Sequence, residues 1–326
     1  MDNILVTENR KEMIEIGRKI FTSKPDTYRP IIIESMKKHI DRIMTTASNE
    51  QKDNVFYQSI YDFWVYGTNI GEEFFYGFLN KSHAEKAEYI TFRTRLIYAG
   101  HLNNKELAHK LLDDKYMTYK VLTPFFKRDV VLVNKKESYE EFKKFISKHT
   151  EFVVKPLSLG LAVGVHKDNV TNYIDDQTLF KRLLDDALFY KNNYRWGGDL
   201  GVVLEEIIPQ DKRMAVLHPG SANAIRITTV KAGNKVHIWY PWIKMGVNGE
   251  FVTSGALNSI NASVNASTGV LDTDAQNEYL EFFTNHPNTQ VKIKGFQVPE
   301  WATLVSMVKE LALNLKKSII LDGTWC

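Results

Sequence analysis

The chain has 326 residues, which predicts two or three compact units rather than one small core. Its net charge of +3 gives no reason to expect nucleic acid or an acidic membrane surface as a partner. The single cysteine, Cys326, excludes a disulfide framework within the chain and a zinc site made of several cysteines. Because neither a signal peptide nor an apolar run of about 18 residues is visible, we expect a cytoplasmic protein without a membrane span.

Residues 1–112 are expected to form a mainly helical N-terminal region. Apolar side chains recur at helical spacing in the segments 31–44 and 58–67, and few Gly or Pro residues interrupt them. The many aromatic side chains of this region are typical of a helical core rather than of a ligand site.

After residue 129 the pattern changes to that of a β–α–β unit. The run VVLV at 130–133 is typical of a short buried strand. Ser138, with Glu141 three residues later, matches a capping box and predicts a helix with Phe142 and Phe145 on its inner face. The elements expected next are a strand, a glycine turn and a second strand over 151–165, an amphipathic helix over 176–190 and a strand over 201–208.

The C-terminal part of the chain is rich in strand-like segments. Three of them, separated by turn signals, lie between residues 223 and 265, and an amphipathic helix follows over 302–316. The fold class expected is therefore α+β, with a small lobe over 113–205 and a large lobe over 206–326.

The segment VVKPLSLGLAVGV combines a strand, a lysine and a glycine turn. Lys155 ends the apolar run, Ser158 and Gly160 begin the turn, and Gly164 closes it. Glycines let backbone N–H groups approach phosphate oxygens, and a lysine beside such a turn adds a positive charge. The alternative is a plain hairpin that carries a surface lysine.

Two carboxylates end the strand in GVVLEEIIPQ. Neighbours on a strand point to opposite faces, so one of Glu205 and Glu206 is expected to face a cleft, where it suits the hydroxyls of a ribose. The alternative is that both are solvated at the end of the strand.

An arginine lies inside the strand-like segment HPGSANAIRITTV. Arg226 stands between Ile225 and Ile227, which share the opposite face, and an arginine so placed usually has an anionic partner. A phosphate or a substrate carboxylate fits this position, as does a structural salt bridge. Lys244 is placed similarly, whereas Lys115 by itself looks like any lysine on a helix.

Together these segments resemble the ATP-grasp superfamily. VVKPLSLGLAVGV resembles its phosphate loop, DDKY an earlier Asp-Lys element, and LEEII the hinge strand that meets adenine and ribose. More narrowly, the chain looks like the sugar-transfer-associated ATP-grasp proteins of polysaccharide gene clusters, through HPGSANAIRITTV, VHIWYPWIKMG and KGFQVPEW. The matching stretches follow the family's order over roughly residues 85–326. The resemblance implies two α+β lobes that clamp ATP.

The same resemblance implies a set of roles and a reaction. The reaction is ATP-dependent ligation, in which a carboxylate becomes an acyl phosphate and an amine displaces the phosphate, with ATP and Mg²⁺ as cofactors. The substrates implied are a small-molecule carboxylate and an amine or sugar-linked molecule. The implied residues are Lys115, Lys155, Ser158, Gly160 and Gly164 for the phosphates, Glu205 or Glu206 for the nucleoside, Arg226 and Lys244 for catalysis, and Asp322 for Mg²⁺.

The chain departs from the family's pattern at its C-terminal end. The family usually continues past this aspartate into a strand with a Glu and an Asn that bind metal, whereas this sequence ends four residues after Asp322. A degenerate nucleotide binder, a shortened chain, and substitution by other acids such as Asp272 or Glu250 all account for this. The leading hypothesis is a ligase acting on a cell-envelope or capsular sugar precursor. The alternatives are a non-catalytic nucleotide-binding scaffold or regulator and a phosphotransferase.

Overall fold

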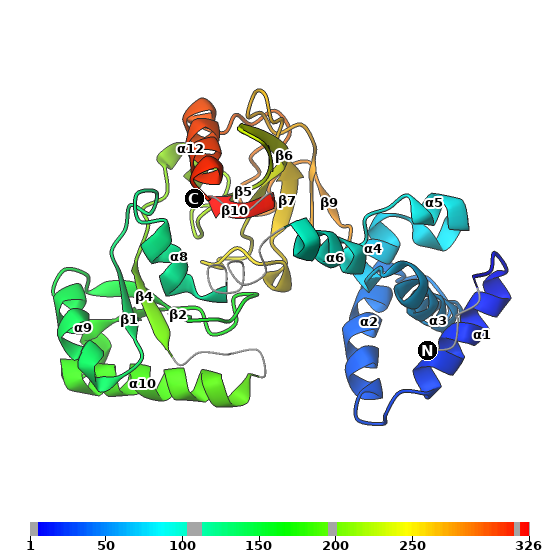
Figure 1. Cartoon of the computed structure of the whole chain (residues 1–326), viewed down its shortest axis with the longest axis horizontal. Coiled ribbons are helices and arrows are strands. Elements are labelled where there is room, and N and C mark those ends of the chain that lie inside the picture. The colour runs from blue at the N-terminus through cyan, green and yellow to red at the C-terminus, as the bar shows by residue number, and fades with distance from the viewer. Residues whose placement is uncertain (1–5, 103–112, 195–200, 316–319, 326) are drawn as a thin grey trace. The chain divides into compact units, whose positions relative to one another are not determined.

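The protein folds into two compact units, seen in a computed structural model (Figure 1). The first comprises residues 1–101 and 278–281, and the second comprises residues 102–277 and 282–326. The structure describes residues 6–102, 113–194, 201–315 and 320–325, without the side chains of Ala99, Leu102, Ala256 and residues 320–325.

The first unit is built from helices, as the sequence predicts. Its longest helix, α3, begins at a capping box formed by Ser48 and Gln51 and ends at Gly67, whose φ is 79°. Gly17 lets α1 pack closely on α3, because a Cβ there would lie 1.9 Å from the carbonyl oxygen of Tyr57. The helices of this unit are α1 (Arg10–Thr22), α2 (Arg29–Ile43), α3 (Asn49–Tyr66), α4 (Ile70–Phe75), η1 (Phe78–Asn80), α5 (His83–Ala87) and α6 (Phe92–Leu102).

A fully buried ion cluster ties α3 to α5. The Lys86 ammonium donates to both carboxylate oxygens of Asp62, at 2.9 and 3.0 Å, and both residues are at most 1% exposed. Glu73, also buried, lies beside them, and burial together with the negative Asp62 raises the pKa of the Glu73 carboxyl well above its usual value. The cluster thus holds two carboxyls and one ammonium away from water.

The second unit begins with a four-stranded antiparallel sheet in the order β1-β4-β2-β3. Helices α9 and α10 cover one face, and their apolar side chains form one core with the strands (Figure 1). The strands predicted at 130–133 and 201–208 and the helix at 176–190 are confirmed. The elements are α8 (Lys115–Val121), β1 (Val130–Val133), η3 (Lys136–Ser138), α9 (Tyr139–Ile146), β2 (Glu151–Pro156), β3 (His166–Asn169), η4 (Val170–Asn172), α10 (Asp176–Asn193) and β4 (Val202–Glu206).

The start of α9 differs from the prediction. Phe142 and Phe145 are buried as expected, but the capping box is wrong. Ser138 has helical dihedral angles because the turn η3 runs directly into α9, and its hydroxyl donates to Asn134 Oδ1 at 3.1 Å. A side chain in that geometry cannot reach back to cap the first turn.

A six-stranded antiparallel sheet completes the second unit, in the order β10-β5-β6-β7-β8-β9. The residues Ile225 and Ile227 of β5 pack into a core with α12, and Arg226 between them therefore lies on the opposite face. The remaining elements are α11 (Lys212–Ala215), β5 (Ala224–Ala232), β6 (Lys235–Met245), η5 (Gly255–Leu257), β7 (Ile260–Ser263), β8 (Ala275–Gln276), β9 (Phe282–Phe283), α12 (Trp301–Asn314) and β10 (Ile320–Trp325).

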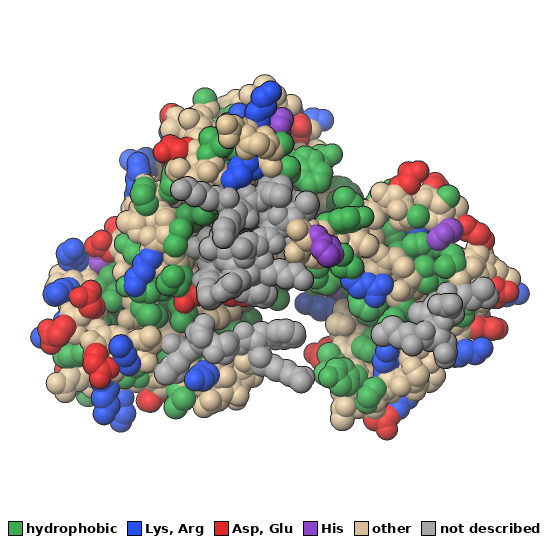
Figure 2. Space-filling view, in the orientation of Figure 1, with side chains coloured by type: hydrophobic (Ala, Val, Ile, Leu, Met, Phe, Trp, Pro, Cys, Tyr) green, Lys and Arg blue, Asp and Glu red, His purple; other side chains and the backbone are tan. Residues whose placement is uncertain are grey.

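The observed fold class is α+β, as predicted. Acidic and basic side chains are interspersed over the region that carries α9 and α10, in keeping with the small net charge (Figure 2). Among the described residues, no helix is long and apolar enough to cross a membrane.

Candidate functional site

The face of the first sheet opposite α9 and α10 carries a buried carboxylate with two cations. Lys155, at the end of β2, donates to Glu205 Oε2 at 2.7 Å, and Arg128 lies 3.1 Å from the same oxygen. The strand register places Val153 opposite Glu205, so Lys155 on β2 reaches the carboxylate on the neighbouring strand β4 along a diagonal. Glu205 is only 7% exposed, so its charge is largely shielded from water. Two positive charges, those of Lys155 and Arg128, lie next to this one negative charge.

A third cation, Lys115, holds the start of the glycine loop. Asp114 caps α8 by accepting from the N–H of Met117 at 2.8 Å, which fixes the position of Lys115 in the first turn. The Lys115 ammonium donates to the carbonyl oxygens of Pro156 at 2.8 Å and Leu159 at 2.6 Å. Three cations therefore lie close to Glu205 beside the loop, an arrangement that suits a polyanion. The carboxylates of Asp113 and Asp114 also interact electrostatically with Lys115.

The pKa of Lys115 reports this environment. Burial, followed by repulsion from Lys155, lowers that pKa from 10.5 to about 8. Because the unfolded chain binds more protons than the folded one between pH 8 and 10.5, the contribution of Lys115 to folding stability rises with pH in that window. We expect acetic anhydride labelling of Lys115, followed by peptide mass spectrometry, to reach half its maximal rate near pH 8. A midpoint near 10.5 contradicts the buried, repelled ammonium.

The glycine loop itself has an unusual backbone. Leu161 and Ala162 have φ values of 56° and 61°, and Gly164 has 70°. Left-handed non-glycine residues cost free energy and persist where the surrounding structure imposes them, which occurs often at binding sites. The hydroxyl of Ser158 is buried and has no hydrogen-bond partner among the described residues. The loop thus combines a strained backbone with an unsatisfied donor.

Replacing each of the two glycines of the loop by alanine should affect stability differently. A Cβ at Gly164 would lie 2.6 Å from the ring of Tyr190, and the left-handed φ adds about 1–2 kcal/mol, so Gly164→Ala should lower both stability and ligand affinity. A Cβ at Gly160 would meet no heavy atom within 4 Å, so Gly160→Ala serves as the matched control for stability and should leave the free energy of unfolding unchanged. Chemical denaturation of both variants checks the stability, and nucleotide titration of Gly164→Ala checks the affinity. Equal losses of stability at the two positions contradict the role given to Gly164.

The second sheet presents its own cationic face. Arg226 and Lys244 both lie against the ring of Trp242, at 5.6 and 5.3 Å from its centroid. Lys244 is opposite Asn261 of β7, whose amide oxygen is buried and unpartnered among the described residues. The backbone of Asp322 lies in β10 opposite Thr228, but its side chain is outside the described part, so its role stays a prediction.

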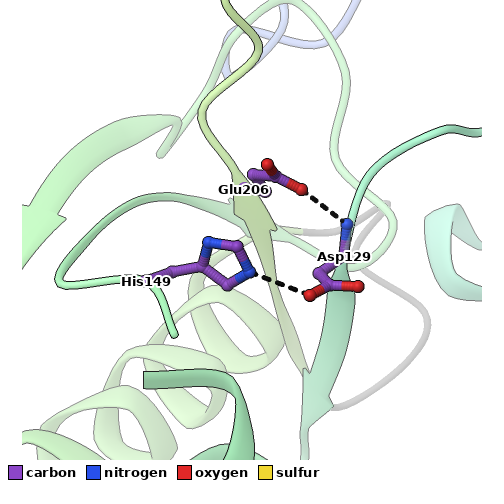
Figure 3. Close-up of side chains that lie close together, drawn as sticks. All are labelled: Asp129, His149 and Glu206. Atoms are coloured by element: carbon purple, nitrogen blue, oxygen red, sulfur yellow. Dashed lines mark hydrogen bonds and ion pairs between the residues drawn. The ribbon is translucent and has the colours of Figure 1, made fainter. Parts of the chain in front are cut away.

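Glu206 points elsewhere, as alternation along a strand requires. Its Oε2 accepts from the N–H of Asp129 at 3.0 Å, and Asp129 accepts from His149 Nε2 at 2.9 Å (Figure 3). The hydrogen bond from His149 lowers the pKa of the Asp129 carboxyl. Among the described residues these three form the one cluster of His, Cys, Asp or Glu close enough to share an ion. Mg²⁺ prefers an octahedron of oxygens, and these groups already bind one another, so the cluster ties strand ends together.

The structure therefore divides the predicted residues into groups. Lys115, Lys155 and Glu205 come together beside the loop, whereas Glu206 belongs to the cluster of Asp129 and His149. Arg226 and Lys244 share one ring on the second sheet. The residue that the sequence analysis missed is Arg128, two positions before β1, and the only signal for it was an arginine next to a buried strand.

Comparison with known proteins defines the family. The model of the sugar-transfer associated ATP-grasp family matches residues 93–322, more than two thirds of the chain. The chain belongs to this family and has an ATP-grasp fold, which confirms the resemblance found in its motifs. No curated protein sequence matches it.

Solved structures show distant similarity. D-cycloserine synthetase DcsG is 11% identical, with a TM-score of 0.36 over 68% of this chain and 60% of that protein. D-alanyl-alanine synthetase A from Vibrio cholerae is 10% identical, with a TM-score of 0.28 over 62% and 65%. D-Alanine-D-Alanine ligase from Helicobacter pylori is 15% identical, with a TM-score of 0.30 over 67% and 62%. The chain spans less than two thirds of the length of each of these three proteins.

Proposed function

We propose that this protein is an ATP-dependent carboxylate–amine ligase of the cytoplasm, acting in cell-envelope or capsular polysaccharide biosynthesis. Its ATP lies between the lobes predicted over 113–205 and 206–326. The observation that carries the proposal is the convergence of Lys115, Lys155 and Arg128 beside a strained glycine loop, in a member of an ATP-grasp family. The proposed substrates are a small carboxylate and an amine or sugar-linked molecule.

The proposed nucleotide contacts follow from the charges. Triphosphate oxygens attract the ammonium groups of Lys115 and Lys155. The buried Ser158 hydroxyl, which has no partner within the described part of the chain, gains an acceptor. Once the phosphates engage Lys155, Glu205 can accept a hydrogen bond from a ribose hydroxyl, while Arg128 still neutralises its charge. Gly160 and Gly164 let the loop backbone approach the phosphates closely.

The proposed chemistry uses the second sheet. A carboxylate oxygen attacks the γ-phosphorus and ADP leaves, which gives an acyl phosphate. The amine nitrogen then attacks the acyl carbon, phosphate leaves, and the nitrogen loses a proton. The guanidinium of Arg226 and the ammonium of Lys244, side by side at Trp242, stabilise the negative charge that builds up on the phosphoryl and acyl oxygens.

Magnesium accompanies ATP in this proposal, where it neutralises charge on the phosphate oxygens. On the cationic face, Asn261 Oδ1 is an oxygen without a hydrogen-bond partner among the described residues, and Asp322 remains the predicted carboxylate ligand. These two donors alone do not make an octahedral site, so phosphate oxygens and water have to complete it.

Turnover with pooled substrates tests the proposal. We expect ADP release with MgATP only when both a carboxylate pool of amino acids and sugar acids and an amine pool are present. Arg226→Gln should abolish it, whereas Arg213→Gln, at an exposed position, should not. ADP release with a single acceptor class indicates a phosphotransferase instead. Nucleotide binding without any turnover indicates a scaffold or regulator and overturns the ligase proposal.

A further inference from the structure

A cavity of about 340 Å³ lies behind the larger sheet, between the start of α12 and the segment that follows β4. This volume is at the lower end of the range for ligand pockets, and most of the lining is apolar, as is usual for such pockets. The apolar lining consists mainly of Ile208, Pro209, Met214, Val298, Leu304 and Met307.

The cavity is separate from the proposed nucleotide and catalytic groups. Ile225 lines it and belongs to the core under α12, whereas the next residue, Arg226, lies on the opposite face of β5. A molecule in this cavity therefore contacts neither Arg226 nor Lys244, which share the far face of the sheet.

One buried polar group in the cavity wall lacks a partner among the described residues. Asn223 is 3% exposed and its Nδ2 donates to the carbonyl oxygens of Met214 at 2.8 Å and His218 at 3.1 Å, which fixes the orientation of its amide. Its Oδ1 accepts no hydrogen bond from any part of the chain that the structure describes. A buried acceptor left in this state costs about 1–3 kcal/mol, and a donor on a ligand removes that cost.

The rim of the cavity sets the charge that it accepts. Arg213 donates to Asp211 at 2.7 Å and to Glu300 at 3.2 Å, so an ion triad bridges the two walls of the cavity. With two carboxylates against one guanidinium the rim is negative, which disfavours anionic ligands. The backbone of Glu300, directly before α12, has a left-handed conformation with a φ of 52°.

We propose that this cavity binds a small neutral apolar molecule, or the apolar part of a larger one, that bears an N–H or O–H donor. The apolar walls bind its body, and the Asn223 carbonyl oxygen accepts its donor. Indole is a suitable probe because it is neutral, apolar and carries one N–H. The compound 1-methylindole is the matched probe without the donor.

Ligand-observed NMR titration of the full chain tests the proposal. We expect saturable binding of indole and binding of 1-methylindole that is weaker by about tenfold, the value of one good hydrogen bond. Saturating ATP should leave the indole titration unchanged. Lack of saturable indole binding, equal binding of the two probes, or competition by ATP overturns the proposal.

Two tryptophan variants locate the probe. Thr303 is exposed on α12 and lines the cavity, so Thr303→Trp should fill it and abolish indole binding. Ala302, also exposed but not part of the lining, gives the control Ala302→Trp, which should bind indole as the original chain does. Thermal melts of both variants check that they are folded. Equal indole binding by the two variants places the probe elsewhere and overturns the proposal, whereas indole binding without ATP binding refutes only the ligase proposal.

Discussion

Replacing Lys86 by methionine should destabilise the helical unit by about 3–5 kcal/mol, the usual cost of removing one member of a buried ion pair. The Lys86 ammonium is the group that the Asp62 carboxylate binds at 2.9 Å, and both side chains are at most 1% exposed. Without the ammonium, Asp62 must either keep a buried charge or take up a proton. Urea denaturation followed by circular dichroism, with hydrogen exchange of the α3 and α5 peptides, measures the loss.

A pH series separates this mechanism from a simple packing defect. Burial raises the pKa of the Asp62 carboxyl, and removal of Lys86 should raise it further. A carboxyl with a raised folded-state pKa stabilises the fold at low pH and loses that contribution as pH rises through the folded-state pKa. Lys86→Met should therefore lose less stability at pH 5 than at pH 8. The control Lys11→Met, at an exposed position of α1, should leave the free energy of unfolding unchanged at both pH values. A loss of stability by Lys86→Met that does not depend on pH contradicts the ionic explanation.

Periodicity explains why most elements were predictable. The helix over 176–190 buries one face in the core, and its apolar residues recur at helical spacing in the sequence. The strand VVLV joins the same core and was predictable from its run of β-branched residues. The start of α9 was not predictable, because the turn η3 changes the dihedral angles of Ser138 and no periodicity records such a turn. Helix starts depend on local geometry that several sequences satisfy in different ways.

Contacts between distant segments account for what the sequence did not predict about the site. Lys155 and Glu205 are separated by 50 residues, and each was singled out, but their ion pair depends on the register of β2 and β4. Arg128 was missed because it joins them only through the pairing of β1 with β4. Lys115 looked ordinary until the fold placed its ammonium on the loop carbonyls. The sequence thus predicted that charged residues such as Lys155 and Glu205 belong to a site, but it did not predict which of them pair with one another.

Replacing Lys155 by alanine should weaken ATP binding by about 10–100-fold, the range expected for a lost charge-assisted contact of roughly 1.5–3 kcal/mol. Binding to the folded state raises thermal stability by linkage, so the shift caused by ATP measures the loss. Adenosine binding should change little, because it has no phosphates. Lys144→Ala, at an exposed position of α9, is the control, and ATP should raise its melting temperature as much as that of the original chain.

Weaker ATP binding by Lys155→Ala could also arise from the loss of the ion pair between Lys155 and Glu205. A double variant distinguishes the two explanations. If Lys155 acts only by neutralising the buried Glu205, then Lys155→Ala combined with Glu205→Gln removes the uncompensated charge and should restore ATP binding. If the ammonium itself binds phosphate, the double variant stays as weak toward ATP as Lys155→Ala. We expect the second result, since Arg128 still neutralises Glu205 in the single variant and leaves the triphosphate as the group that loses a partner.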